Sequence, residues 1–198
     1  ETVRQLTKTD LFDRVLSAIF FLVFLLVLLT FDVLQRCAHL LDLLKLPKIG
    51  KPTYQQWTAI GLNISLSLTT RIVGAKLHSN FAEPLDKNKS YIFVANHQSF
   101  FDTFLLIAVL RCWNPKFVAK KELGKWIPSV SFNLRTGGHA LIDRQNPRQA
   151  MPMLEAFALR AFDHHESIIV FPEGTRSRDG SLLPYRLGGF QKILTIMP

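Results

Sequence analysis

Seventeen consecutive residues near the N-terminus, Val15 to Phe31, are apolar except for Ser17 and Thr30. Such a run needs surroundings without water, either lipid or a protein core. As a helix it extends about 26 Å, slightly less than the roughly 30 Å hydrocarbon core of a bilayer. The run therefore predicts a helix that crosses the membrane with the help of its neighbours or dips into one leaflet. A signal peptide is the competing interpretation, but no small-residue cleavage site follows.

The pattern changes between Leu34 and Leu46. Apolar and polar residues there recur on opposite sides of a helix: Leu34, Cys37, Leu41 and Leu44 against Arg36, His39, Asp42 and Lys45. This arrangement predicts an amphipathic helix suited to a membrane surface. Because Arg4, Lys8 and Arg14 precede the apolar run, we expect the N-terminal end to lie on the cytoplasmic side of the membrane.

The next segment supports two interpretations. Pro47, Gly50 and Pro52 should end the amphipathic helix. Residues 60–68 then alternate with a period of two, which favours a strand. However, small residues recur at every fourth position and would let one membrane helix press against another, with Trp57 at the interface: Gly61, Ser65 and Thr69. Given the apolar surroundings, we expect a helix over residues 54–70.

From Arg71 onward the chain is typical of an α/β domain. Expected strands cover 71–77, 91–95, 116–119, 139–142 and 167–171, and expected helices cover 99–111, 147–162 and 190–196, with helix and turn over 122–136. This regular alternation predicts a mostly parallel sheet flanked by helices. We therefore expect two parts, membrane-associated helices at residues 1–70 and a catalytic domain at residues 71–198.

Composition narrows the choice of partners. Hydrophobic residues make up 48% of the chain, with 16 Phe, which points toward lipid, and the net charge of +9 suits anionic lipid or phosphorylated substrates. Nucleic acid is the weakest partner, because no Lys/Arg-rich helix or aromatic-interleaved basic run is present. Cys37 and Cys112 lack metal-ligand spacing, so we expect free thiols in a reducing compartment. The sequence His164-His165-Glu166 contains ligand types, but adjacent residues converge poorly on one ion, and no metal site is expected.

The stretch Asn96 to Asp102 lies where the strand at 91–95 ends and the helix at 99–111 begins. Catalytic groups often occupy this place in α/β folds. His97 can accept a proton near neutral pH, and Asp102 can fix its tautomer and stabilise the charged ring. Ser99-x-x-Asp102 is also a capping box, which alone would explain the aspartate. The stretch by itself leaves catalysis and capping equally open.

Further polar residues follow the later strands: Lys120, Asp143, Arg144, Glu173, Gly174, Thr175 and Arg176. Arg144 and Arg176 could bind a phosphate in bidentate fashion, with Lys120 as a point charge. Gly174 permits close backbone approach, and the N–H groups of its neighbours could bind an anion. Glu173 could be a second acid, or could hold an arginine or a backbone N–H. Cations at three successive strand ends predict a phosphate pocket beside the histidine.

Three stretches resemble the motifs of the glycerolipid acyltransferase family, in order and at fitting distances. Residues 96–102 resemble its His-x4-Asp motif, residues 138–144 its second motif and residues 171–177 its third, and Lys120 in Phe-Val-Ala-Lys-Lys-Glu-Leu matches a family lysine. Gln98 and the ending Ile-Asp-Arg144 resemble the lysophosphatidic acid (1-acylglycerol-3-phosphate) acyltransferase branch. The glycerol-3-phosphate branch more often has arginine after the histidine.

The resemblance covers residues 54–198 and brings further expectations. The family carries an N-terminal pair of membrane-attached helices, which agrees with a helix over residues 54–70. Its fourth motif would fall just beyond Pro198, so we expect the catalytic domain to be truncated at its C-terminal end.

The resemblance also implies a reaction: acyl transfer from an acyl thioester to the sn-2 hydroxyl of lysophosphatidic acid, giving phosphatidic acid. In that mechanism His97 takes the proton of the hydroxyl and Asp102 orients the ring. The remaining site residues would hold the acceptor phosphate: Lys120, Arg144, Glu173, Gly174, Thr175 and Arg176. No metal, cofactor or covalent intermediate is expected.

The identity of the substrates and the location stay open at this point. The donor could be acyl-CoA or an acyl carrier protein. Other acceptors are another lysophospholipid or ornithine lipid, and a transacylase, a hydrolase or a non-catalytic membrane protein are the alternatives to this reaction. The expected location is the bacterial inner membrane, with the catalytic domain on its cytoplasmic side and the acyl chains along the membrane helices.

Overall fold

The computed structural model describes residues 8–44, 60–61, 64 and 78–197 of the chain. Its centre is a sheet of four parallel strands: β1 (Ile92–Val94), β2 (Lys116–Lys120), β3 (Ala140–Ile142) and β4 (Ile168–Val170). The strand order is β1-β4-β2-β3, with Phe93 paired to Ile169 and Val118 to Ala140. The expected mostly parallel sheet is confirmed. Because all four strands run the same way, their carboxyl ends meet at one edge.

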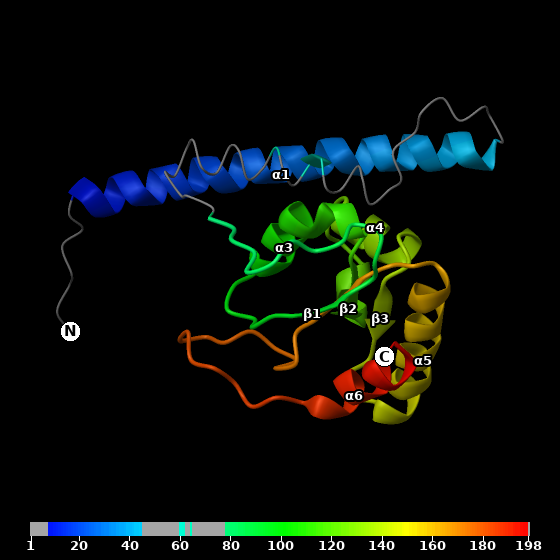
Figure 1. Ribbon diagram of the computed structural model, residues 1–198. Coiled ribbons are helices and arrows are strands. Elements are labelled where there is room, and N and C mark those ends of the chain that lie inside the picture. Colours follow the sequence, from blue (N-terminus) through cyan, green and yellow to red (C-terminus); the bar gives the residue numbers. More distant parts are fainter. Residues whose placement is uncertain (1–7, 45–59, 62–63, 65–77, 198) are drawn as a thin grey trace.

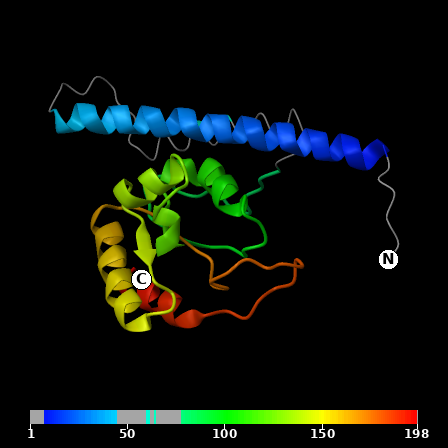
Figure 2. The same ribbon diagram turned by 180° about the vertical axis from the view of Figure 1, so that it is seen from behind.

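Successive side chains of each strand point to opposite faces of the sheet and pack into two separate hydrophobic layers. Phe117 and Ile169 belong to one layer, which includes α1 (Lys8–Leu43) and α3 (Asp102–Leu110). Ile168 and Val170 belong to the other, under α5 (Pro147–Asp163) and α6 (Leu187–Ile196). Figures 1 and 2 show these helices on the two sides of the sheet. The connections contain η1 (Arg111–Trp113), η2 (Lys121–Gly124) and α4 (Val130–Thr136).

The apolar N-terminal segment forms part of one continuous helix, α1, of 36 residues. At 1.5 Å per residue this helix is about 54 Å long. It runs through both the apolar run and the amphipathic segment, so the predicted change of pattern is not a break. Its buried positions follow the helical period and pack against α3 and the sheet: Phe20, Phe24 and Leu28. Farther along, the backbone N–H of Ser129 donates to Asp32 across 2.7 Å.

The opposite face of α1 carries exposed apolar side chains, among them Leu22, Leu25, Leu26 and Leu29. The predicted stripe at the C-terminal end of the helix is also exposed, including Leu34, Leu41 and Leu44. The stretch Leu11–Leu43, 33 residues, is long and apolar enough to cross a membrane. The helix therefore packs on the domain with one side and presents an apolar surface with the other.

The segment after α1 is described only in part. Ile60, Gly61 and Ile64 are helical, as the helix interpretation of residues 54–70 expects. A Cβ added at Gly61 would lie 2.8 Å from the ring of Phe31, so glycine permits close approach to α1 there. The breakers at 47–52, Trp57, the rest of the small-residue stripe, the strand at 71–77 and the domain boundary at 70/71 fall outside the described residues.

Candidate active site

His97 and Asp102 lie between β1 and α3, and their side chains are in contact. Nδ1 of His97 is 3.0 Å from Oδ2 of Asp102, and both side chains are largely shielded from solvent. The same carboxylate oxygen accepts the backbone N–H groups of Gln98 and Ser99, each at 2.7 Å. Three donors thus hold Asp102 in place. The two residues are five positions apart in the sequence. The turn between β1 and α3 brings their side chains within hydrogen-bond distance.

The capping question has a mixed outcome. Asp102 accepts the N–H of Ser99, which is one half of a capping box. The other half is absent, because the hydroxyl of Ser99 accepts from the N–H of Phe101 and no side chain caps α3 at Phe101. The capping interpretation, which the sequence left open, is therefore met by Asp102 but not by the hydroxyl of Ser99. Asp102 serves the turn and the histidine with the same oxygen.

Three residues of the loop after β4 contact His97. Oε1 of Glu173 accepts the N–H of His97 at 3.1 Å, and the N–H of Ser177 donates to its carbonyl at 2.9 Å. The ring of Phe171 stacks on the imidazole with centroids 4.2 Å apart and planes at 20°. β4 lies directly beside β1 in the sheet, which brings these two sequence-distant stretches together. Glu173 is almost fully buried, so of its predicted alternatives the structure shows it holding a backbone N–H.

This geometry determines which nitrogen of His97 can act. An ionised carboxylate only accepts, so Nδ1 carries the proton it donates to Asp102. Nε2 of the neutral ring then has a free lone pair. Because His97 lines a cavity, this lone pair is available to a group bound there. The arrangement can remove a proton from a hydroxyl and stabilise the imidazolium that results.

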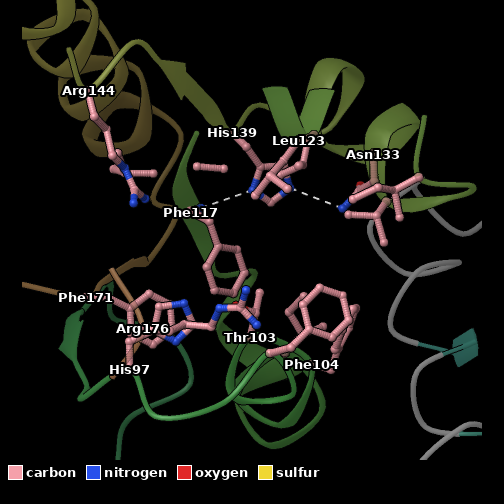
Figure 3. Close-up of a pocket in the computed structure, with 17 residues that line it drawn as sticks. His97, Thr103, Phe104, Phe117, Leu123, Asn133, His139, Arg144, Phe171 and Arg176 are labelled. Atoms are coloured by element: carbon pink, nitrogen blue, oxygen red, sulfur yellow. Dashed lines mark hydrogen bonds between the residues drawn. The ribbon is translucent and has the colours of Figure 1, made fainter. Parts of the chain in front are cut away.

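The cavity beside His97 has a volume of about 200 Å³ and a mostly apolar lining from α3, β2, η2 and α4. Figure 3 shows His97, Phe171 and Arg176 at one side, Phe104 and Thr103 nearby, and His139 and Asn133 across the cavity. A hydrocarbon chain fits such a lining.

The polar group on the far side of this cavity is neutral. His139 is buried, and its Nδ1 accepts the N–H of Phe117 at 3.0 Å while its Nε2 lies 3.2 Å from the amide nitrogen of Asn133. Burial lowers the pKa of His139 to about 3, and the nearby charges of Lys116 and Arg160 act in the same direction. The described residues that line this end of the cavity are therefore neutral near neutral pH.

This histidine predicts a pH dependence of stability. Its pKa is about 3 in the folded protein and 6.5 as a free side chain, so acid protonates the unfolded chain first. Its stabilising contribution is complete above about pH 6.5 and is lost as the pH falls toward 3. We expect the free energy of unfolding to fall less steeply between about pH 7 and about pH 5 in His139→Gln than in the wild type. Parallel slopes in urea unfolding experiments would contradict this assignment.

The predicted cations are not all at the cavity. Arg144 and Arg176 line it, and the guanidinium of Arg176 lies 5.8 Å from the ring centre of Phe100. Lys120 is half exposed, with Nζ 3.5 Å from Oε2 of Glu122, and is not among the lining residues. Its role as a phosphate ligand remains a prediction without support from this placement.

The backbone around Gly174 agrees with close approach of a ligand. Gly174 has φ of +69°, which side chains rarely permit, and Thr175 beside it is exposed. The guanidinium of Arg144 donates to the carbonyl of Gly174. Burial, followed by the charge of Arg186, lowers the pKa of Arg144. A second arginine thus lies near this group, where an anion would relieve the repulsion.

Sequence reasoning missed three contributors: Phe171, Ser177 and Arg186. The first two are members of the third motif, but stacking and backbone contacts leave no pattern in a sequence. Arg186 follows the last strand by sixteen residues, too far to be counted as a strand-end residue. In the cluster considered for metal binding, Glu166 instead pairs with Lys116 at 3.1 Å and Arg160 at 2.8 Å.

Comparison with known proteins gives consistent matches. The family model described as "Acyltransferase" matches residues 76–196. A 1-acyl-sn-glycerol-3-phosphate acyltransferase of Cocos nucifera is 36% identical over 118 residues, 56% of this chain and 37% of the relative. An enzyme of the same name from Haemophilus influenzae is 29% identical over 126 residues, 63% of this chain and 51% of the relative. The chain therefore spans about half or less of the length of these relatives.

A solved structure is also similar. The 1-acyl-sn-glycerophosphate (LPA) acyltransferase PlsC from Thermotoga maritima superposes with a TM-score of 0.55 at 25% sequence identity, covering 72% of this chain and 55% of that one. This similarity agrees with a parallel sheet flanked by helices.

Proposed function

The chain belongs to the acyltransferase family, and on this premise we propose that it transfers an acyl group from a thioester to the sn-2 hydroxyl of 1-acyl-sn-glycerol 3-phosphate. The product is phosphatidic acid. The observation that carries the proposal is the 3.0 Å contact between His97 and Asp102 at the edge of an apolar cavity, which leaves Nε2 free to accept a proton. The names of the similar proteins support the choice of acceptor.

The donor chain occupies the cavity beside His97 in this proposal. Its apolar lining and its neutral far end suit a fatty acyl chain, with the thioester carbonyl at the end where His97 lies. In this orientation the carbonyl carbon is close to any hydroxyl that contacts Nε2, and such positioning can supply a large part of the rate enhancement. The donor is the thioester of coenzyme A or of an acyl carrier protein.

The transfer step needs no nucleophile from the protein. Nε2 of His97 takes the proton of the acceptor hydroxyl as its oxygen attacks the thioester carbonyl. Asp102 stabilises the imidazolium that forms. When the tetrahedral intermediate collapses, the C–S bond breaks, the new ester remains on the acceptor, and the imidazolium returns its proton to the thiolate. We propose that neither a metal nor another cofactor takes part.

The experiment is an acyl-transfer assay with the intact protein, both donors and a panel of acceptors, with and without a chelator. We expect the highest kcat/KM with lysophosphatidic acid and the same rate after chelation. A higher kcat/KM with another lysophospholipid or an ornithine lipid would reject the acceptor. Thiol release without any acceptor would identify a thioesterase, and transfer from a phospholipid without a thioester would identify a transacylase.

The acceptor phosphate should depend on the arginines. Each charged hydrogen bond to a phosphate is worth about 1.5–3 kcal/mol, so Arg144→Ala or Arg176→Ala should raise the KM for lysophosphatidic acid about ten- to hundredfold. The KM for the donor should change little. Steady-state kinetics with each substrate varied in turn measures both constants. An unchanged acceptor KM in both variants would place the phosphate elsewhere.

We further propose that the outer face of α1 contacts the lipid bilayer. Because Phe20, Phe24 and Leu28 are buried against the domain, lipid can reach only the opposite face, which favours attachment along one leaflet over a straight crossing. The basic residues before the apolar run, Arg4, Lys8 and Arg14, favour a cytoplasmic location for the domain. In a bacterium this is the inner face of the inner membrane.

Replacing the four outward leucines of α1 with glutamine should weaken this attachment: Leu22, Leu25, Leu26 and Leu29. Each buried leucine contributes about 1.5–3 kcal/mol, so binding to phosphatidylglycerol-containing vesicles should fall at least about a hundredfold. Vesicle flotation measures the bound fraction. The matched control, Leu159→Gln with Phe162→Gln on the exposed side of α5, should float like the wild type. Equal loss in both variants would contradict a specific role of α1.

A further inference from the structure

A second cavity lies on the other side of the sheet, between the strands and the helices α5 and α6. Its volume is about 390 Å³. Aliphatic and aromatic side chains from both helices form its walls, including Ala150, Met151, Leu154, Phe190 and Ile193. These helices are on the side of the domain away from α3 (Figures 1 and 2). The proposed donor chain does not occupy this cavity.

Two arginines form the polar end of the cavity. Arg144 and Arg186 both line it, together with Gly174. Arg144 donates to the carbonyl of Gly174, and a Cβ at Gly174 would lie 3.3 Å from Cδ of Arg186. Within the described part of the chain, neither arginine has an ion pair with a carboxylate. Glu122 acts on Arg144 through its charge without forming an ion pair with it. Two neighbouring guanidinium groups that pair with no carboxylate among the described residues are suited to a bound anion, and phosphate matches their geometry.

The two cavities meet at the active site. Arg144 and Phe171 line both of them, and the ring of Phe171 stacks on the imidazole of His97. A phosphate at Arg144 therefore lies at the junction of the two cavities. A molecule bound there could keep a hydrocarbon chain in the second cavity while it presents a hydroxyl to His97.

We infer that the second cavity holds the acyl chain of the acceptor, and that Arg186 joins Arg144 and Arg176 in holding the acceptor phosphate. This inference rests on the proposed function. It places the acyl chain of the donor on the α3 side of the sheet and the acyl chain of the acceptor on the α5/α6 side. The occupant is a single-chain phosphorylated lipid, because the walls are aliphatic and the polar end is doubly cationic. Arg186 is then a specificity-determining residue for the phosphorylated head group.

Filling the cavity tests the chain's location. A Cβ at Gly189 would lie 3.2 Å from Cδ1 of Leu154, a cavity wall residue, so Gly189→Leu directs new methyl groups into the cavity. Displacing one or more methylene groups from an apolar pocket costs about tenfold or more. We expect the KM for hexadecanoyl lysophosphatidic acid to rise about tenfold, while the KM for the hexanoyl acceptor and for the donor change less than about twofold. Gln191→Leu adds the same side chain on the exposed side of α6 and should leave all three constants unchanged.

Removing the second cation tests the phosphate's location. Arg186→Gln should raise the KM for both lysophosphatidic acids about tenfold, whereas Arg178→Gln, an exposed arginine of the same loop, should not. Three results for Gly189→Leu would overturn the inference and leave the proposed function standing. They are an equal rise in KM for both acceptor lengths, a rise in the KM for the donor alone, and no change in any KM. A wild type that acylates neither acceptor would reject the proposed function and this inference with it. Thermal unfolding of each variant separates these effects from misfolding.

Discussion

Replacing His97 with alanine should reduce kcat for acyl transfer by about a hundred- to ten-thousandfold. Among the described residues that line the cavity, His97 is the one whose Nδ1 is held by a carboxylate while Nε2 can accept the proton of the acceptor hydroxyl, and the variant lacks it. No protein nucleophile takes part in the proposed step, so no covalent intermediate can carry part of the reaction. The measurement is the single-turnover rate of phosphatidic acid formation with saturating donor and acceptor.

The change should not alter the fold. Glu173 and Ser177 contact the backbone of residue 97, and alanine keeps both of these hydrogen bonds. The circular dichroism spectrum, the unfolding temperature and vesicle binding should therefore resemble those of the wild type. Near-normal turnover in a folded His97→Ala protein would mean that another group is the base.

Asp102→Asn should also cause a large loss of rate, and it separates catalysis from capping. Oδ2 of Asp102 accepts the imidazole and two backbone N–H groups, and an amide oxygen in the same place can accept all three. What the substitution removes is the negative charge beside the imidazolium. Unit charges about 4 Å apart attract each other by about 4 kcal/mol at an effective dielectric constant of 20. If most of this attraction is lost, kcat should fall about a hundred- to thousandfold.

The stability of Asp102→Asn should change by less than about 1 kcal/mol, because asparagine serves turn and cap positions as well as aspartate does. Urea unfolding measures this difference beside the rate. Ser99→Ala is the matched control, since it removes the hydroxyl contact with Phe101 and leaves the charge of Asp102 in place. A stability loss in Asp102→Asn with nearly normal kcat would show that the aspartate only holds the turn.

The sheet could be predicted because short apolar runs alternating with helices leave few other arrangements. The parallel direction of the strands then places His97, Arg144 and Glu173 at one edge, and the structure shows all three there. The strand order β1-β4-β2-β3 could not be read in this way, yet it is the reason that Glu173 reaches His97.

Directions of long side chains were harder to predict. A position at the end of a strand tells which edge of the sheet a residue lies at, but not where its side chain points. Lys120 pairs with Glu122, two residues later, and is not among the residues that line the cavity. Arg186 reaches the site because of the path that its loop takes, and the sequence of that loop has no periodic pattern. Such contacts depend on tertiary packing, which local spacing does not encode.

The role of α1 shows a similar limit. In a run where almost every residue is apolar, no polar face marks the side that meets protein, so the buried set of Phe20, Phe24 and Leu28 could not be separated from its outward neighbours. The structure shows that α1 shares a hydrophobic layer with Phe104 and Ile169. The segment is therefore part of the packed domain as well as a surface for lipid.

One measurement tests the central claim most directly: the ratio of thiol released to phosphatidic acid formed when the intact protein receives lysophosphatidic acid and an acyl thioester. We predict one thiol per molecule of phosphatidic acid, with the new acyl group at the sn-2 oxygen and both products lost together in His97→Ala. Thiol release without phosphatidic acid, or both products at wild-type rates from His97→Ala, would contradict base-catalysed transfer at this site.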